Sequence, residues 1–491
     1  MNLNMKFDWN DISIVPAILS DISSRNEVDT RNKDNKLPLF TAPMDMVISA
    51  ANVDKFYNSG LNITLPRHIK YDELKNDNYF YSYGLDEIIE ILDNKVQLPP
   101  KVLIDIANGN MRKLYDTSKR IKEVYGDNIE LMIGNIANPE TYRMFCDIGV
   151  DYCRVSVGSG SACFVGDTIV NTKNGNKKIS NIENGDFVLT HTGEYKEVIN
   201  TIQYNTTENL ININDTISTN DHKYYVIDTK YIDKVTDDNI HKYAIWISAE
   251  DLDPENHLLV EVEEIKRYKL RKIEKKEIVE NVDCKVYDLT VYDDHSYTAN
   301  GNIVHNCTTS ANTSVHYPTA SLVNECYEIS LTYRTSKTGK YTKIIADGGF
   351  RNFSDIIKAL ALGSDYVMIG SILSKTFESC SDFYIKDDNN YKKIIESDAE
   401  VLYNEGIELY KYYRGMSTKE VQKFWNKKEL KTSEGISKYN KVEYTLDKWV
   451  NNLDGYLRST MSYCNKRTLD DFIGKSEYVF ITQNAFNRFN K

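Results

Sequence analysis

The sequence contains no run of about 18 apolar residues, the length that a helix needs to cross a bilayer. Its first residues, MNLNMKFDWNDIS, are polar where a secretory signal peptide carries an apolar segment. An excess of basic residues is also missing, since Lys and Arg number 60 against 72 Asp and Glu, and the net charge is −12. A surface that follows nucleic-acid phosphates needs such an excess. We therefore expect a soluble, cytoplasmic protein that neither spans a membrane nor binds nucleic acid.

The eight cysteines contain no C-x-x-C pair, so the sequence predicts neither a disulfide framework nor a zinc site. Free cysteine usually behaves as a small buried hydrophobe, and we expect this of Cys146, Cys326 and Cys464. Cys163 and Cys307 differ from them, because each lies where the pattern of the sequence changes.

The chain has 491 residues and is long enough for more than one domain, because single cores rarely grow past about 250 to 300 residues. Up to Ala162, and again after Cys307, short apolar runs alternate with amphipathic stretches. This alternation is typical of βαβ units around a parallel sheet. The predicted strands are residues 102–108, 130–137, 151–157, 341–349 and 364–371, and the predicted helices are residues 110–126, 139–149 and 354–363.

Residues 163–306 have a different pattern, with short β-type runs separated by turn signals. Asn-Gly pairs begin at Asn174, Asn184 and Asn300, and they favour tight hairpins because both residues tolerate positive φ. The sequence therefore predicts an all-β module inserted into an α/β protein. Strands are predicted over 168–172, 187–192, 223–228 and 243–247, and the charged segment 230–276 as a whole has no clear pattern.

The edges of this module carry Cys163 at the front and Val304-His305-Asn306-Cys307 at the back. Inside it lie Thr219-x-x-His222 and the segment VYDLTVYDDHSYTANGNIVHN at 286–306. Together these pieces resemble the conserved blocks of inteins, in the same order. The resemblance implies a self-splicing mini-intein with the horseshoe-shaped all-β (HINT) fold, and no homing-endonuclease segment is recognisable. It divides the chain into a first flank (1–162), the intein (163–306) and a second flank (307–491).

Splicing of this kind needs a nucleophile at each edge of the insert. Cys163 would attack the carbonyl of Ala162 and turn the amide into a thioester, which is an activated acyl group. Cys307 would then take over the first flank. Asn306 would cyclise onto its own carbonyl and cut the chain before Cys307, and an S-to-N acyl shift would restore a peptide bond. No cofactor takes part.

The intein resemblance also implies helper roles inside the insert. Thr219 and His222 would polarise and protonate the amide before Cys163, and His305 would assist Asn306. Histidine suits such roles because it can move protons near neutral pH. The middle steps would be assisted by Asp288 and His295.

Joining Ala162 to Cys307 gives the run VGSGSA-CTTS. The flanks also contain SSRNEVDT (23–30), APMD (42–45), DIANGN (105–110), ADGG (346–349), MIGS (368–371), YRGMS (413–417) and SEG (433–435). In this order the pieces resemble the IMP dehydrogenase/GMP reductase family over nearly the whole joined chain. The resemblance implies a (β/α)8 TIM barrel, in agreement with the alternating pattern, and a homotetrameric oxidoreductase that acts on a purine nucleoside monophosphate.

The resemblance also implies an active site around Cys307, which would attack C2 of the purine and form a covalent intermediate that gives or receives hydride. Glycine amides at strand ends of such barrels commonly hold a phosphate, so we expect this of Gly349, Gly370 and Ser371. Asp347 is expected to bind the ribose hydroxyls. The remaining expected contacts are Ser161, Tyr413, Gly415 and Met416 at the nucleotide, Asp105 and Asn135 at the nicotinamide, and a monovalent cation such as potassium at the carbonyls of Gly158, Gly160 and Cys307.

Two activities remain open for the joined chain. A dehydrogenase oxidises IMP with NAD and carries a mobile flap with an Arg-Tyr pair, whereas a reductase converts GMP to IMP with NADPH and uses a Thr and a Glu, here Thr309 and Glu434. Residues 417–433 contain no Arg-Tyr pair, which favours the reductase. The spellings APMD and YRGM resemble the dehydrogenase, however, and Pro66-Arg67 replace the usual His-Lys pair. A third hypothesis is that the flanks carry the intein without being catalytic.

Overall fold

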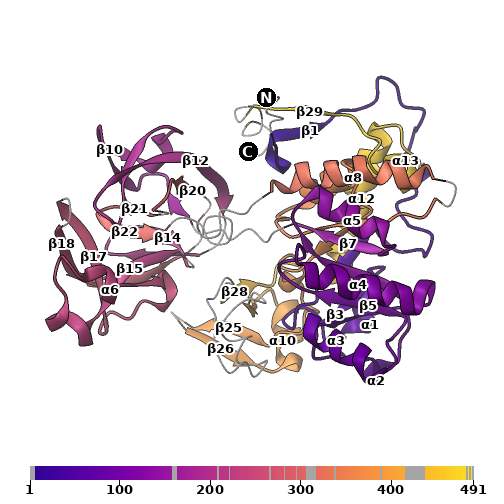
Figure 1. Cartoon of the computed structure of the whole chain (residues 1–491), viewed down its shortest axis with the longest axis horizontal. Coiled ribbons are helices and arrows are strands. Elements are labelled where there is room, and N and C mark those ends of the chain that lie inside the picture. Colours follow the sequence, from indigo (N-terminus) through magenta and orange to yellow (C-terminus); the bar gives the residue numbers. More distant parts are fainter. Residues whose placement is uncertain are drawn as a thin grey trace. The chain divides into compact units, whose positions relative to one another are not determined.

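The structure is a computed structural model, and it divides into two compact units (Figure 1). The first unit contains residues 1–158 and 316–491, and the second contains residues 159–315. No helix in the described part of the chain is long and apolar enough to cross a membrane. The structure describes residues 6–156, 163–206, 209–220, 222–264, 267–280, 282, 284–294, 296–305, 317–336, 339–387, 390–414, 437–482, 485 and 488.

The first unit is built on a parallel sheet whose eight described strands follow the order β2-β24-β23-β7-β6-β5-β4-β3. A parallel bridge between Phe40 and Asn62 brings the two ends of the sheet together beside β3. The sheet is therefore nearly closed, in the arrangement of a (β/α)8 barrel. The strands are β2 (Leu39–Thr41), β3 (Thr64–Leu65), β4 (Phe80–Tyr83), β5 (Lys101–Asp105), β6 (Glu130–Ile136), β7 (Tyr152–Val155), β23 (Lys343–Asp347) and β24 (Tyr366–Ile369).

Helices α5 and α9 of this unit each start at an asparagine whose side chain caps the helix. The side chain of Asn138 accepts the N–H of Glu140 at the start of α5, and the side chain of Asn352 accepts the N–H of Asp355 at the start of α9. The strands and helices predicted from the alternating pattern are confirmed, with ends that differ by a few residues. The helices are α1 (Val53–Asn58), α2 (Tyr71–Leu74), α3 (Leu85–Asp93), α4 (Arg112–Tyr125), α5 (Pro139–Asp147), α8 (Thr319–Arg334), α9 (Phe353–Ala361), α10 (Glu396–Asn404), α12 (Leu446–Tyr463) and α13 (Leu469–Phe472).

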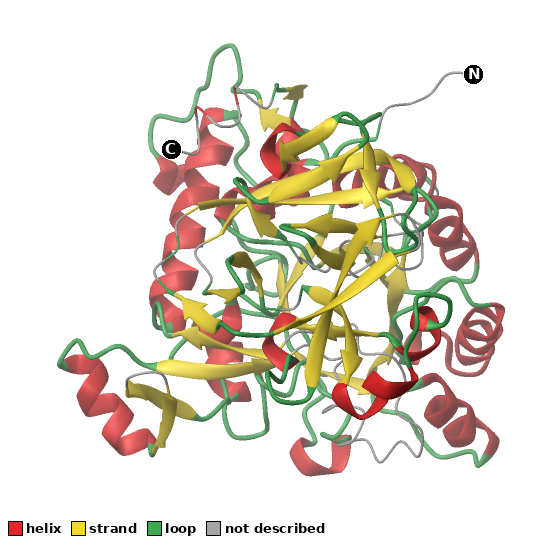
Figure 2. Cartoon of the chain, turned by 90° about the vertical axis from the view of Figure 1, so that its left-hand side faces the viewer, coloured by secondary structure: helices red, strands yellow, loops and turns green. Residues whose placement is uncertain are grey.

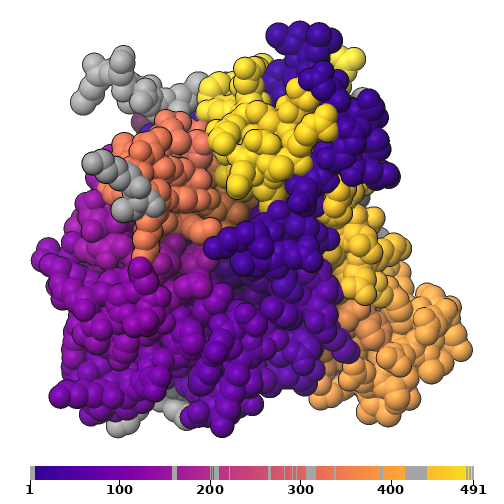
Figure 3. All heavy atoms as spheres, turned by 90° about the vertical axis from the view of Figure 1, so that its right-hand side faces the viewer, coloured from indigo at the N-terminus to yellow at the C-terminus, as the bar shows by residue number. Residues whose placement is uncertain are grey.

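The two ends of the chain close against each other on this unit. Strand β1 (Ile12–Ile14) pairs antiparallel with β29 (Tyr478–Phe480). The ring of Phe7 lies 5.0 Å from that of Phe480 in an edge-to-face contact. Figure 3 shows the indigo N-terminal residues beside the yellow C-terminal ones, although nearly the whole sequence separates them.

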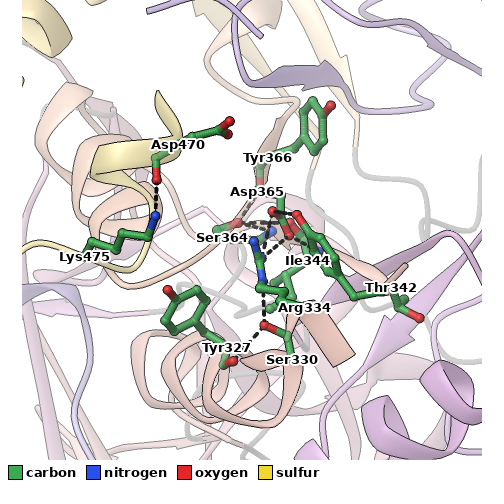
Figure 4. A network of polar contacts seen from close by, with 12 residues as sticks. Tyr327, Ser330, Arg334, Thr342, Ile344, Ser364, Asp365, Tyr366, Asp470 and Lys475 are labelled. Atoms are coloured by element: carbon green, nitrogen blue, oxygen red, sulfur yellow. Dashed lines mark hydrogen bonds and ion pairs between the residues drawn. The ribbon is translucent and has the colours of Figure 1, made fainter. Parts of the chain in front are cut away.

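Helix α8, the first described helix after the second unit, is fixed to the barrel by a buried ion pair (Figure 4). Nη2 of Arg334 donates to both carboxylate oxygens of Asp365, at 2.8 and 3.0 Å. The same carboxylate accepts the N–H of Ile344 at 2.8 Å and the hydroxyl of Tyr341 at 2.7 Å. These contacts lie where β23 and β24 begin, which is the face of such barrels that contributes to stability rather than to chemistry.

A four-stranded antiparallel sheet also belongs to the first unit, with the order β26-β25-β27-β28. Lys411 of this sheet is only 1% exposed. Its Nζ donates to the carbonyl of Ser379 and lies 3.9 Å from the ring centre of Phe383. Burial lowers the pKa of Lys411 to about 7, although Cys380 and Glu396 oppose the shift. The strands are β25 (Phe383–Asp387), β26 (Asn390–Ile394), β27 (Tyr410–Arg414) and β28 (Ser437–Lys441).

The buried amine makes stability depend on pH. Between about pH 7 and pH 10.5 the folded chain holds Lys411 neutral while the unfolded chain protonates it, so the free energy of unfolding should rise with pH by at most about 1.4 kcal/mol per unit. Below about pH 7 Lys411 is protonated in both the folded and the unfolded chain. The burial of its charge then lowers the free energy of unfolding by the largest amount. We expect Lys411→Met to remove this rise when urea unfolding is compared at about pH 7 and about pH 9. The exposed Lys393 of β26 is the control, and equal slopes for Lys411→Met and the native chain would contradict the prediction.

The second unit consists mainly of antiparallel strands, which dominate it in Figure 2. Asn300 and Gly301 have φ of 48° and 87° and join β21 to β22, so the hairpin predicted at this Asn-Gly pair is confirmed. The strands are β8 (Phe164–Val165), β9 (Ile169–Thr172), β10 (Gly175–Lys178), β11 (Phe187–Leu189), β12 (Tyr195–Thr206), β13 (Leu210–Ile213), β14 (Thr216–Thr219), β15 (Lys223–Asp228), β16 (Ile245–Ser248), β17 (His257–Glu264), β18 (Arg267–Lys272), β19 (Lys276–Val279), β20 (Cys284–Val291), β21 (Ser296–Ala299) and β22 (Asn302–His305).

The charged segment 230–276 is more regular than its sequence indicated. It forms the edge strand β16 and the hairpin of β17 and β18, and the charged residues lie on the hairpin. One helical turn, α6 (Ile240–Tyr243), also interrupts the strands. Charges on both exposed strands of the hairpin hide the period-two alternation by which a half-buried strand is recognised.

Candidate functional site

The carboxyl ends of four neighbouring barrel strands carry one polar network. Nη1 of Arg154, on β7, donates to Oδ1 of Asp105 at 2.7 Å. Nε and Nη2 of the same arginine lie 2.9 and 2.7 Å from Oδ2 of Asp347, the last residue of β23. Nδ2 of Asn135, on β6, donates to that oxygen at 2.8 Å. Catalytic residues of (β/α)8 barrels come from this end of the strands, so the network marks the candidate site.

A second arginine reaches the network from the loop after β3. Nε of Arg67 donates to Oδ2 of Asp105 at 3.0 Å, and its Nη2 donates to the carbonyl of the same residue. Burial alone would raise the pKa of Asp105, but the charges of Arg154 and Arg67 outweigh it and hold this pKa below its ordinary value. Asp105 is thus held as a carboxylate, and each of its oxygens accepts a hydrogen bond from a different arginine.

Asp347 keeps one oxygen for another partner. Its Oδ2 takes the donors from Arg154 and Asn135, and no described residue donates to its Oδ1. Gly348 and Gly349 follow with φ of 91° and 77°, in the left-handed region that favours glycine. After β24, a Cβ on Gly370 would lie 2.5 Å from Sδ of Met44. The backbone therefore turns tightly after Asp347, and at Gly370 the packing of Met44 leaves no room for a side chain.

The comparison with known families identifies this barrel. A model described as the IMP dehydrogenase / GMP reductase domain matches residues 87–185 and 300–489, which are more than half of the chain. The chain belongs to the IMP dehydrogenase/GMP reductase family. Members of this family act on purine nucleoside monophosphates with nicotinamide nucleotide cofactors.

The relatives of this chain include proteins named IMP dehydrogenase and proteins named GMP reductase. The inosine-5'-monophosphate dehydrogenase of Cryptosporidium parvum is 34% identical over 185 residues, which are 36% of this chain and 40% of the relative. The GMP reductase of Ascaris suum is 27% identical over 186 residues, which are 38% and 45% of the two chains. The GMP reductase of Lactobacillus delbrueckii subsp. bulgaricus is 30% identical over 187 residues, or 32% and 52%. The matched part thus spans about half of each relative or less.

The network contains three residues that the sequence predicted and two arginines, Arg154 and Arg67, that it did not predict as site residues. Asp105, Asn135 and Asp347 lie together, whereas Arg154, which connects them, was missed. Its signal in the sequence was a lone arginine inside the apolar run 151–157. Gly349, Gly370 and Ser371 lie at the ends of β23 and β24, and Tyr413 lies on β27. The predicted Gly158, Gly160, Ser161, His295, Asn306, Cys307, Thr309, Gly415, Met416 and Glu434 lie outside the described residues.

The second unit contains a separate group of predicted residues around Cys163. The N–H of Cys163 donates to Oγ1 of Thr219 at 2.9 Å, and the N–H of Thr219 donates to the carbonyl of Cys163 at 2.8 Å. The N–H of His222 donates to the Thr219 carbonyl at 3.2 Å, and its ring centre lies 3.9 Å from that of Phe164. All of these side chains are buried. The predicted Thr219 therefore lies at the amide of Cys163, and the predicted His222 packs against Phe164, the residue after Cys163.

Asp288 reaches the same place from β20. Strands β20 and β8 are antiparallel and pair through Tyr287 and Phe164. The next pair of positions along these two strands is Asp288 and Cys163. The carboxylate of Asp288 is fully buried, and its Oδ1 accepts the hydroxyl of Tyr297 at 2.6 Å. A carboxylate is thus held by hydrogen bonding beside the first residue of the predicted insert.

His305 ends the strand β22 in the same unit. This strand pairs with β15 through Val304 and Tyr224, and β15 begins directly after His222. The ring of Phe164 also lies 6.4 Å from that of Tyr224. Phe164 at the front edge of the predicted insert is thus in ring contact with Tyr224, whose cross-strand partner Val304 precedes His305 at the back edge.

Proposed function

We propose that the chain is a precursor that removes residues 163–306 by protein splicing and joins its two flanks into a GMP reductase. The observation that carries the proposal is the hydrogen bond between the Cys163 amide and Thr219, because this amide belongs to the bond that the first step must break. The third hypothesis, flanks without catalysis, is disfavoured by the retained network of Asp105, Arg154 and Asp347.

The first step makes particular demands on the groups around Cys163. When its sulfur attacks the carbonyl of Ala162, the Cys163 nitrogen becomes an amine and must gain a proton. Thr219 holds that nitrogen by its hydrogen bond, and His222, in the same turn, supplies the proton. Asp288 lies next along the neighbouring strand, where a carboxylate can orient or relay a proton between the thiol and the following nucleophile.

The later steps need the two edges of the insert to be close together. Cys307 takes the acyl group from the thioester, and Asn306 then cuts the chain by cyclisation, with His305 moving the proton. The pairing of β15 with β22 supports this sequence, because it brings the strand after His222 beside the strand that ends at His305. The family match is interrupted over residues 186–299, which lie inside the proposed insert, while its two segments also include residues 163–185 and 300–306.

The joined barrel is proposed to bind the nucleotide at the ends of β23 and β24. Oδ1 of Asp347, to which no described residue donates, fits a ribose hydroxyl donor, and the backbone amides at the glycine turns of Gly349 and Gly370 would hold the phosphate. Cys307 forms the bond to C2 of the purine, while Thr309 and Glu434 act on the departing ammonia. The nicotinamide cofactor, NADPH in this proposal, would supply the hydride when bound, and Asp105 and Asn135 are the residues that would hold its nicotinamide.

The choice of reductase rests on residues 417–433, which are short and contain no Arg-Tyr pair to activate water. The second candidate is an IMP dehydrogenase, favoured by the spelling of APMD at 42–45 and by the relative from Cryptosporidium parvum. Potassium at the loop of Cys307 and a homotetramer after splicing are further proposals taken from the resemblance.

Two measurements test the proposal in sequence. A denaturing mass spectrum of the chain, expressed and held under reducing conditions, should contain a joined product of residues 1–162 and 307–491 and a separate product of residues 163–306. Absorbance at about 340 nm, where reduced nicotinamide absorbs, should fall with GMP and NADPH and stay constant with IMP and NAD. A single full-length chain would overturn the splicing part, and oxidation of IMP without reduction of GMP would assign the dehydrogenase.

A further inference from the structure

The turn after β11 forms four hydrogen bonds with Asp294 and Ser296, at the start of β21. The hydroxyls of Thr190 and Thr192 both donate to Oδ2 of Asp294, the second at 2.7 Å. The N–H of His191 donates to Oγ of Ser296 at 3.0 Å, and its Nδ1 lies 2.8 Å from the same oxygen. This turn, residues 190–192, is therefore hydrogen-bonded to both Asp294 and Ser296.

The imidazole of His191 is connected to His305 along two routes. Ser296 is the cross-strand partner of His305 in the β21–β22 hairpin, and it is fully buried. The ring of Trp246 lies 5.9 Å from that of His191 and 4.8 Å from that of His305, edge-on to the latter. One route thus runs through a hydrogen bond and the other through an aromatic ring.

Other contacts fix His191 in this place. The hydroxyl of Tyr268 donates to the His191 carbonyl at 3.0 Å, and that hydroxyl also lies 3.0 Å from Nε2 of His241. The ring of Tyr225 packs on Trp246 at 4.5 Å. Burial lowers the pKa of His191, while Asp294 opposes the shift. A neutral imidazole suits this place, because a second positive charge beside His305 would compete with the proton that His305 must carry.

From this arrangement we propose that His191 is a positioning residue for the cleavage at Asn306, acting through Ser296 and Trp246 on His305. The inference rests on the proposed splicing function and adds to it a residue outside the intein motifs. In the cleavage, the side-chain nitrogen of Asn306 bonds to its own carbonyl carbon and loses a proton. The bond to the Cys307 nitrogen breaks, and that nitrogen gains a proton, which His305 delivers.

The test separates the two half-reactions in the full-length chain. Cleavage before Cys307 is followed by mass spectrometry in a Cys163→Ala background, and thiol-induced cleavage before Cys163 is followed in an Asn306→Ala background. We expect His191→Ala to slow the first by at least about 10-fold, because displacements near 1 Å are enough for losses of that size. The second half-reaction should stay within about 2-fold, since Thr219 and His222 are untouched.

Two further variants make the result specific. His191→Asn can still hydrogen-bond Ser296 and should restore most of the rate before Cys307. His257→Ala is the matched control, because this histidine accepts the N–H of Asp253 and should leave both half-reactions unchanged. Equal slowing of both half-reactions by His191→Ala, or no rescue by His191→Asn, would overturn the inference. A native chain that cleaves at neither edge would instead overturn the proposed splicing itself.

Discussion

A chain that carries Cys163→Ala together with Asn306→Ala is expected to stay uncut and to lose at least about 10²-fold in oxidoreductase turnover. The barrel of this chain should still fold, since α8 is fixed to β23 and β24 by the Arg334–Asp365 pair, whose two residues both belong to the first unit. In the uncut chain, however, the whole insert separates the residues around Cys307 from strand β7. A nucleophile displaced by about 1 Å can already cost on the order of 10²-fold in rate.

The measurement compares this uncut chain with the joined enzyme, expressed directly from residues 1–162 fused to 307–491. Both substituted positions lie within residues 163–306, so the flanks of the two samples are identical. Turnover of GMP with NADPH should appear in the joined enzyme alone, and a mass spectrum should show the variant as one intact chain. Comparable turnover in both samples would show that the barrel tolerates the insert and that splicing does not switch the enzyme on.

The repeating parts of the fold could be predicted because they depend on local pattern. The strands that became β5, β6, β23 and β24 are continuous apolar runs, and each is followed by a polar or glycine turn. The Asn-Gly pair at Asn300 fixed a hairpin through its tolerance of positive φ. Cys146, Cys326 and Cys464 are buried as expected. In each of these cases the deciding interaction lies within a few residues along the chain.

The candidate site, in contrast, depends on contacts between residues that lie far apart in the sequence. Arg154 joins Asp105 to Asp347 across residues from three strands, and nothing in the run 151–157 indicates which carboxylates an arginine there will meet. Arg67 was noticed only as a departure from the family pattern, whereas its hydrogen bonds to Asp105 give it a place in the network. His191 likewise depends on the folding of β11 against β21, which no local motif announces.

Replacing Cys307 by alanine is expected to abolish ligation and redox turnover together. Ligation stops because no thiol remains to take the acyl group from Cys163, so the thioester can only hydrolyse. Turnover stops because the bond to C2 of the purine cannot form, and loss of a catalytic nucleophile typically costs at least about 10⁴-fold. Mass spectrometry should detect separate flanks and no joined chain.

Cys307→Ser separates the two roles and makes the prediction sharper. A serine hydroxyl can still accept an acyl group as an ester, so some joined chain should form, at a reduced rate. The same hydroxyl is a weak nucleophile at its ordinary pKa, with no thiolate to attack the purine, so the joined serine enzyme should turn over at the level of the alanine variant. Alanine and serine variants, prepared directly as joined chains, give this comparison without any dependence on splicing. Near-native GMP reduction by either would exclude a covalent Cys307 intermediate, while ligation by the alanine variant would exclude Cys307 as the nucleophile that follows the insert. If this one thiol has both roles, a substitution at Cys307 that changes how the insert is removed also removes the nucleophile on which the joined enzyme depends.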